Sequence, residues 1–434
     1  MLNKKINAYS LLILGLFSII IGIILITNGI KLVELLIYLL GSLIILIGVT
    51  NSFKKSEKTK FSILMKSFVN ILFGIIIILL KNYILSSISM LFGTYLFLIA
   101  FIDIISYFIY RQNHLKERLW NFLHFLFNFI FFLIFFFAPN VHLKYVFIII
   151  GIYLILYGIK NILNFITVIM PQSTANKIKN HIEIPLPIFI SAVLPKRLIN
   201  LINEQLEEKD IPDFDFHKIK EIPNLEVLIH LAEKGSASFG HMELAIDNKI
   251  ISYGNYNKHS RRLFDSIGDG ILLVADKEEY MKYCIQKKDR FIISYGIILT
   301  EKQEKTLKNT IKKLFKDTIP YYPDRELMDK KVTDNLDIND MSSDIYKYAN
   351  GKFYKITKGK YKTFFVLKNN CALFAGQILK TIGKNVLSFN GIISPGTYYD
   401  YLNNRFKMKN TNVIKRKLYT KASFKEDLCQ NYQK

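Results

Sequence analysis

The sequence predicts a membrane bundle of six helices followed by an α+β domain built on an antiparallel sheet. Composition is the first observation: the 434 residues are 51% hydrophobic, yet the formal net charge is +23. Lys and Arg number 14 against 4 Asp and Glu up to residue 170, and 44 against 31 beyond it. Periodicity is the second observation, because long apolar runs give way to short alternating ones. These changes predict a transmembrane domain at 1–170, a linker at 171–221, a sheet domain at 222–404 and a basic tail at 405–434.

Six apolar runs are long enough to cross a bilayer, whose hydrocarbon core of about 30 Å needs about 20 residues of helix. Only short polar segments separate them, which favours membrane spans over buried helices of a soluble protein. The first run lacks a small-residue cleavage site, so we expect a retained helix rather than a signal peptide. The runs are 8–28, 33–50, 62–80, 83–109, 119–138 and 144–168.

The second, fourth and sixth runs share a pattern, seen in "GSLIILIGVTN", "GTYLFLIAFID" and "GIYLILYGIKN". Each has a glycine, a small residue seven positions later and an Asn or Asp three positions after that. The spacing of seven keeps the small residues on one helical face, where another helix can approach closely. We expect Asp103 to make a packing hydrogen bond rather than to line an ion path. The three sets are Gly41/Gly48/Asn51, Gly93/Ala100/Asp103 and Gly151/Gly158/Asn161.

This threefold hairpin repeat resembles the HdeD-like family of small six-helix membrane proteins over residues 8–168. The resemblance implies a membrane module and defines no molecular activity.

Lys and Arg in the short loops predict the orientation in the plasma membrane. Eleven basic residues lie at one end of the helices and three, Lys31, Lys81 and Lys144, at the other. Both termini, and therefore the sheet domain, are expected in the cytoplasm. The basic end carries Lys4, Lys5, Lys54, Lys55, Lys58, Lys60, Arg111, Lys116, Arg118, Lys177 and Lys179.

The linker has an apolar run at 184–194 that is too short to span and is interrupted by prolines. Apolar residues at helical spacing follow from 196 to 206, and they fit either a helix on the inner leaflet or one packed on the domain. Beyond it, strands are predicted at "LEVLIHLAE", "FGHMELAID", "KIISYGNY", "GILLVA" and "RFIISYGIIL", with a turn at Asp247–Asn248.

Helices are predicted at "KEEYMKYCIQKK" and at "TEKQEKTLKNTIKKLF", where Thr300 and Gln303 form a capping box. Residues 320–350 are predicted as loops, and "KFYKITKGKYKTFFVL" as a hairpin that leads into the helix "NNCALFAGQILKTIGKN".

The three cysteines, Cys284, Cys371 and Cys429, are widely spaced, which argues against a disulfide framework and against a zinc ribbon. We predict no metal and no cofactor. Cys371 stands out because it opens an apolar helix, where unpaired N–H groups favour a thiolate. Asn369 and Asn370 precede it as candidate caps.

A thiol nucleophile needs a base and a group that orients the base. Of the histidines at 181, 217, 230 and 241, His230 is expected to pack in an apolar strand, whereas His241 opens a strand after Gly240. Alternation places His241, Glu243 and Ala245 on one face. Glu243 is the candidate orienter, and Ser252, Asn255 and Tyr256 are its rivals.

The order "FGHMELAIDNKIISYGNY" followed by "NNCALFAGQIL" resembles the circularly permuted papain-like thiol enzymes, relatives of the NlpC-type peptidases and of lecithin:retinol acyltransferase. The resemblance covers about residues 222–402 and implies His241 as base and Cys371 as nucleophile. It also implies attack on an amide, ester or thioester.

A cytosol-facing thiol hydrolase or acyltransferase acting on a lipid or peptide is therefore expected. A non-catalytic scaffold with a papain-like domain, and a cell-wall amidase of reversed topology, remain alternatives. The basic tail fits anionic lipid or solvent equally. No nucleic-acid partner is expected, because aromatic residues do not alternate with the basic ones. The sequence assigns no oligomeric state.

Overall fold

The computed structural model divides the chain into two compact units. One unit comprises residues 1–108 and 117–182, and the other comprises residues 109–116 and 183–434. The structure describes residues 2–53, 60–169, 216–217, 221–231, 240–288, 290–333, 336–382, 395–407 and 411–424. The predicted linker and amphipathic segment therefore lie almost entirely outside the described residues.

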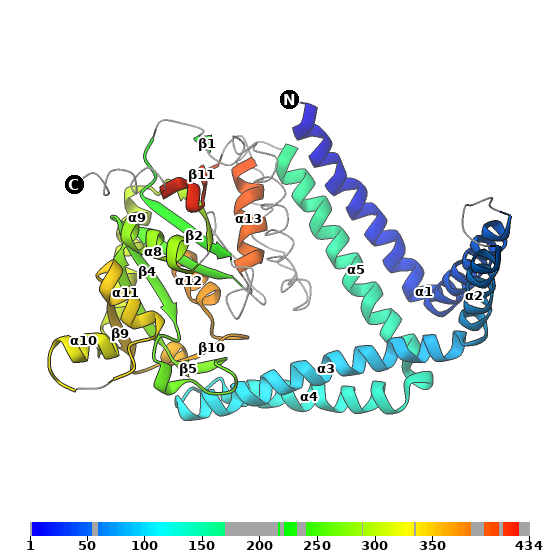
Figure 1. Cartoon of the computed structure of the whole chain (residues 1–434), viewed down its shortest axis with the longest axis horizontal. Coiled ribbons are helices and arrows are strands. Elements are labelled where there is room, and N and C mark those ends of the chain that lie inside the picture. Colours follow the sequence, from blue (N-terminus) through cyan, green and yellow to red (C-terminus); the bar gives the residue numbers. More distant parts are fainter. Residues whose placement is uncertain are drawn as a thin grey trace. The chain divides into compact units, whose positions relative to one another are not determined.

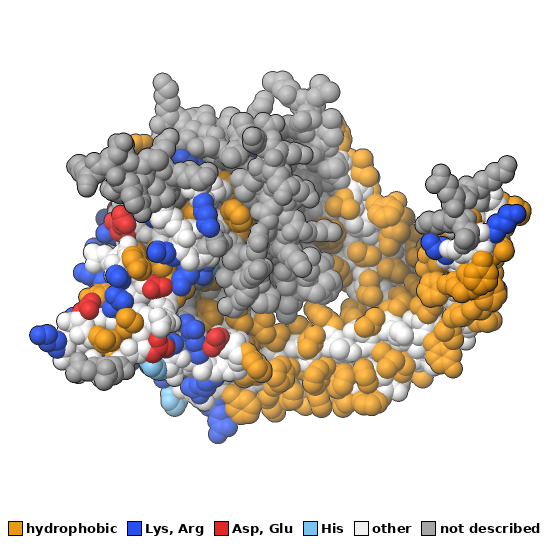
Figure 2. Space-filling model, in the orientation of Figure 1, with side chains coloured by type: hydrophobic (Ala, Val, Ile, Leu, Met, Phe, Trp, Pro, Cys, Tyr) orange, Lys and Arg blue, Asp and Glu red, His pale blue; other side chains and the backbone are white. Residues whose placement is uncertain are grey.

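The first unit is helical, and among the described residues five of its helices are long and apolar enough to cross a membrane. Hydrophobic side chains cover these helices (Figure 2), as expected for surfaces that face lipid. α1 departs from helical geometry at Asn28, where φ is −137° and ψ is 30°. The helices are α1 (Leu2–Ser52), α2 (Lys60–Leu79), α3 (Lys81–Gln112), α4 (Arg118–Phe137) and α5 (Pro139–Ile169).

The predicted close approach of helices at small residues is confirmed. A Cβ added at Gly158 would lie 2.5 Å from the carbonyl oxygen of Gly15, and one added at Gly74 would lie 2.7 Å from that of Gly41. These distances are shorter than real Cβ contacts, so α1 packs against α5 and against α2 with backbone almost touching backbone. Small residues allow this packing where no hydrophobic effect drives helices together.

Asp103 in α3 is buried and makes a packing contact, as predicted. Asn128 of α4 donates its Nδ2–H to Oδ2 of Asp103 over 3.3 Å. The carboxyl group therefore joins two neighbouring helices.

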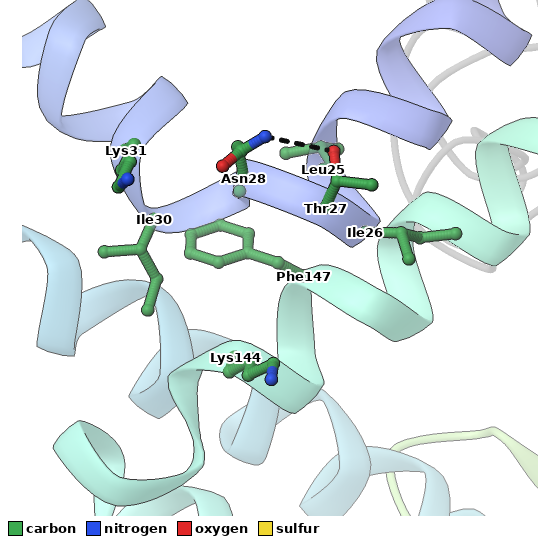
Figure 3. A pocket seen from close by; sticks show the side chains of 9 residues that line it. Leu25, Ile26, Thr27, Asn28, Ile30, Lys31, Lys144 and Phe147 are labelled. Carbon is green, nitrogen blue, oxygen red and sulfur yellow. Dashed lines mark hydrogen bonds between the residues drawn. The ribbon is translucent and has the colours of Figure 1, made fainter.

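A cavity of about 160 Å³ lies beside the break in α1. Figure 3 shows Asn28, Lys31 and Phe147 around it, with the Asn28 side-chain amide donating to the Thr27 hydroxyl over 3.3 Å. Lys144 is its other charged lining residue. The lining contains no thiol, imidazole or carboxylate, so the cavity does not have the groups of a thiol enzyme.

The second unit is built on a nine-stranded antiparallel sheet of order β1-β11-β7-β2-β3-β4-β6-β9-β8. Figure 1 labels β1, β11, β2, β4 and β9 of this sheet. A separate two-stranded sheet pairs β10 with β5. The strands are β1 (Phe216–His217), β2 (Leu225–Leu231), β3 (His241–Ile246), β4 (Lys249–Gly254), β5 (Ile267–Asp269), β6 (Ile271–Asp276), β7 (Phe291–Ile297), β8 (Thr318–Tyr321), β9 (Lys352–Ile356), β10 (Thr363–Phe365) and β11 (Val413–Tyr419).

Helices cover both faces of the large sheet, so the unit has two hydrophobic cores. On one face α8 (Lys277–Lys288) and α11 (Met341–Ala349) bury Tyr280 and Ile345 against strand residues such as Leu273. On the other face lie α9 (Glu301–Phe315), α12 (Cys371–Lys380) and α13 (Pro395–Lys407), with Phe374 of α12 packed on Tyr253. The short elements are η2 (Lys258–Ser260), α10 (Asp324–Asp329), η3 (Lys360–Lys362) and η4 (Lys421–Phe424).

Two local predictions are confirmed at their turn and cap residues. Asp247 and Asn248 both have positive φ, 49° and 59°, which is the geometry of a tight hairpin turn between β3 and β4. Thr300 accepts a hydrogen bond from the Gln303 N–H, and the Gln303 side-chain oxygen accepts one from the Thr300 N–H. The capping box therefore starts α9.

The predicted hairpin over 352–367 is wrong, because β9 pairs with β6 and β8 while β10 pairs with β5. Gly359, at φ 82°, and the following η3 turn the chain away between the two strands. The loop prediction for 320–350 is also wrong over α10 and α11. α11 starts at the Asp340 cap, is only nine residues long and buries two serines beside Ile345 and Ala349, so the sequence shows no long apolar face there.

Residues 413–419 of the predicted basic tail form β11, which pairs with β7. Its apolar residues Val413, Ile414 and Leu418 are buried.

Candidate functional site

Cys371 is the first residue of α12, held there by its cap and by the core. The Asn370 side chain accepts a hydrogen bond from the Leu373 N–H at 2.9 Å, which confirms it as the cap. Ala372 and Phe374 are buried, so the start of the helix is fixed. The thiol therefore sits at the positive end of the helix.

His241 is the first residue of β3, at a place where the sheet is incomplete. The pairing of β3 with β4 runs from Leu244 opposite Ile251 to the turn and does not include His241 or Met242. The backbone N–H of Met242 is therefore available, and it hydrogen-bonds the thiol of Cys371. This opening lets a helix on one face of the sheet bring its first residue to an imidazole on the other face.

The thiol and the imidazole form a hydrogen-bonded pair with opposite pKa shifts. Burial lowers the pKa of His241, but the charge and hydrogen bond of Cys371, together with Glu243, outweigh burial and raise that pKa to about 10. Burial raises the pKa of Cys371, but the charge and hydrogen bond of His241 and the Met242 N–H hold it below its ordinary value. The pair therefore favours thiolate and imidazolium over the neutral forms.

Glu243 is fully buried two residues further along β3. Its Oε1 lies 3.2 Å from Nε2 of His241 and accepts a 2.6 Å hydrogen bond from the Tyr280 hydroxyl. Burial raises the pKa of Glu243, but the neighbouring histidines lower it well below its ordinary value. A charged carboxylate thus stands beside the imidazolium.

Ser252 of β4 also contacts the imidazole, as its place on the same face predicts. Its hydroxyl lies 2.8 Å from Nε2 of His241 and 2.7 Å from the Tyr256 hydroxyl. Glu243 and Ser252 therefore both contact the same ring nitrogen, Nε2. The rival Asn255 donates instead to the Ile267 carbonyl, 3.4 Å away.

His230 is part of this cluster, although the sequence indicated only packing for it. Its Nε2 lies 2.8 Å from Oε2 of Glu243, and its ring is buried. Burial lowers the pKa of His230 below its ordinary value, and the neighbouring Glu243 carboxylate offsets part of this shift. The signal that could have found it is its position on β2 directly opposite His241.

The other predicted residues lie elsewhere or outside the described chain. Asn369 donates to the Lys360 carbonyl at 3.1 Å and does not cap α12. His217 lies in β1 opposite Lys415. Cys284 is buried in α8, and burial raises its pKa to about 12. His181 and Cys429 lie outside the described residues.

Among the described residues, no group of three or more His, Cys, Asp or Glu side chains is arranged to hold a metal ion. The thiol of Cys371, the imidazole of His241 and the carboxylate of Glu243 instead lie in sequence of contact, and these are the groups that catalysis by a cysteine nucleophile requires.

Comparison with known proteins identifies part of the first unit. Residues 65–137, which extend from α2 to the end of α4, match a family model described as "Short repeat of unknown function (DUF308)", an HdeD-like membrane family. The predicted resemblance is confirmed over these residues, and with the apolar helices it marks an integral membrane protein. No curated protein and no solved structure matches the chain.

Proposed function

We propose that the chain is a membrane-anchored cysteine hydrolase or acyltransferase that acts on a carboxylic amide, ester or thioester at the cytoplasmic membrane face. Cys371 is the nucleophile, His241 the base and Glu243 the carboxylate that orients it. The contact between the Cys371 thiol and the His241 ring carries the proposal, because their pKa shifts favour the reactive ion pair. A histidine strand before a helix that opens with cysteine also supports a permuted papain-like fold.

The thiolate of Cys371 attacks the carbonyl carbon, so a C–S bond forms and the C=O π electrons move to oxygen. The Cys371 backbone N–H, at the start of α12, is placed to stabilise this oxyanion. As the tetrahedral centre collapses, the bond to the leaving group breaks and the leaving group takes the proton of the His241 imidazolium. An acyl-thioester on Cys371 remains.

The neutral imidazole then removes a proton from water or from an acceptor hydroxyl or amine. The resulting nucleophile attacks the acyl carbon, the C–S bond breaks, and thiolate and imidazolium are restored. Glu243 carries a negative charge beside the ring throughout, so it lowers the energy of the imidazolium states.

The anchor is a bundle of six spans in this proposal. The apolar part of α1 covers 41 residues, which at 1.5 Å per residue is about 60 Å, roughly twice the hydrocarbon core. The break at Asn28 divides it into two spans. The eleven-to-three distribution of basic residues supports a cytoplasmic location for both termini.

Acyl-enzyme trapping tests the chemistry. Purified full-length protein is mixed with p-nitrophenyl acetate, p-nitrophenyl octanoate and an acyl thioester, and cysteine peptides are analysed by mass spectrometry. We expect an acyl adduct on Cys371, none in Cys371→Ser, and an unchanged yield in the control Cys284→Ser. Ester turnover no higher than that of Cys371→Ser, with no adduct, would instead favour the non-catalytic scaffold.

Protease access to a C-terminal tag tests the orientation. The tag should be cleaved in inverted vesicles and protected in intact cells. Cleavage in intact cells would contradict the cytoplasmic placement and favour the wall-amidase alternative.

A further inference from the structure

An exposed apolar tip protrudes from the second unit, in the loop before β5. The pair Arg262–Ile267 closes this loop, with N–H to oxygen distances of 2.9 and 3.2 Å. Phe264 at its end is fully exposed, and Leu263 beside it is about half exposed. A fully exposed phenylalanine side chain does not take part in the packing of this unit, so the stability of the fold does not explain its position.

The backbone of the tip is in a conformation that side chains other than glycine rarely adopt. Leu263, Phe264 and Asp265 have successive φ values of 52°, 54° and 63°. Three left-handed residues in a row present both apolar side chains outward at a cost in backbone strain. Strain and exposure in the same residues point to an external partner.

The tip is joined directly to the segment that carries the nucleophile. β5 pairs with β10, and the pairing continues past the strands with a hydrogen bond from the Val366 N–H to the Ser266 carbonyl at 3.0 Å. Leu367, exposed, follows at the same end. The Asn370 side chain then donates to the Val366 carbonyl at 3.0 Å, immediately before Cys371.

Basic residues flank the apolar residues in the sequence. Arg261 and Arg262 precede the tip, and Lys368 follows Leu367. Asp265 is the acidic residue of the tip and lies 3.9 Å from the Arg261 guanidinium. Apolar side chains with an excess of positive charge match the interface of a bilayer that contains anionic lipid.

We propose that this tip, Leu263, Phe264 and Leu367 with the flanking Arg261, Arg262 and Lys368, inserts into the anionic leaflet of the membrane that anchors the chain. The inference rests on the proposed function and narrows its substrate class to membrane lipids with an ester- or amide-linked acyl chain. The loop that contacts lipid is the one that continues into α12, so the inserted tip holds Cys371 at the lipid surface.

A single tryptophan at the tip tests insertion. Trp120 is the only tryptophan of the chain, so Trp120→Phe gives a silent background. Phe264→Trp, and Val332→Trp as a control at another exposed apolar position of the unit, are reconstituted in phosphatidylcholine and phosphatidylglycerol vesicles with or without brominated chains. We expect the tryptophan at 264 to lose most of its emission to brominated lipid and the one at 332 to keep it. An unquenched tryptophan at 264, whether exposed or covered by a protein, overturns insertion.

The substrate class is tested with Leu263→Ser/Phe264→Ser and with labelled phosphatidylglycerol in the same vesicles. We expect acyl transfer from vesicle lipid to Cys371 to fall at least tenfold, while iodoacetamide modifies Cys371 at the wild-type rate and so reports an intact site. Equal acyl transfer in the variant overturns the lipid assignment. Absence of any acyl adduct in the wild-type protein with lipid, ester or thioester refutes the proposed function itself. The quenching by brominated lipid tests insertion of the tip, whatever the outcome of the acylation assay.

Discussion

Replacing His241 with alanine should slow alkylation of Cys371 at pH 7 by about ten- to a hundredfold. The variant removes the charge and hydrogen bond that lower the thiol pKa, while burial, which raises it, remains. A thiol with the ordinary pKa of 9.0 is roughly 1% ionised at pH 7, so loss of the imidazole can lower the thiolate fraction by up to about a hundredfold. The thiolate of the variant is more basic and therefore more nucleophilic. This raises its alkylation rate by up to about tenfold and offsets part of the loss.

The assay is modification of the purified full-length protein by limiting iodoacetamide, followed by quantification of each cysteine peptide over time. Cys284 is an internal comparison, because burial raises its pKa to about 12 and it should react slowly in every variant. His259→Ala is the matched control, since this largely exposed histidine contacts Asp324 and not the thiol. An unchanged Cys371 rate in His241→Ala, or equal rates at all three wild-type cysteines, would refute the ion-pair reasoning.

Three further predictions concern the pKa values of the site residues and the packing of the membrane helices. Alkylation of Cys371 should persist to lower pH than that of an ordinary thiol, because the pKa of Cys371 is lowered. Cys284, whose pKa is raised, should stay unmodified through pH 8, and coincident pH–rate profiles of the two cysteines would contradict the opposite pKa shifts. Glu243→Gln removes a charge that raises the His241 pKa, so the His241 imidazolium should lose its proton at lower pH in the variant, as followed by the NMR signals of its ring; an unmoved His241 titration would mean that the carboxylate only packs. Gly158→Leu should lower the melting temperature in detergent, because a Cβ there would lie 2.5 Å from a backbone oxygen of α1; an unchanged melting temperature would show that the helices do not meet at this face.

Local sequence patterns predicted the structural features that depend on residues close together in the chain. Apolar run length indicated the membrane unit, and glycines seven residues apart indicated the faces on which helices meet. Alternation along β3 placed His241 and Glu243 on one face, which the structure confirms through their shared contact with each other. The helix cap at Asn370 was also predictable from the sequence, because a capping side chain accepts a hydrogen bond from a backbone N–H within the first turn of its own helix.

The first two predicted spans, 8–28 and 33–50, lie on either side of the non-helical residue Asn28 of α1. The polar residues Thr27 and Asn28 interrupt the apolar run at this point, so hydropathy divided the segment there. The pairing of β10 with β5 was not predicted, because the pattern of a strand does not specify its partner.

The sequence by itself determined the two-part character of this protein, most of its helical and strand segments, and the face of β3 on which His241 and Glu243 lie. Only the tertiary structure decided that Cys371 meets His241, more than a hundred residues apart in the chain, and that His230 joins Glu243 behind them. The reason is that the periodicity of side chains along a helix or strand depends only on residues that are close together in the sequence. Contact between a helix on one face and a strand residue on the other depends on where the ladder between β3 and β4 stops.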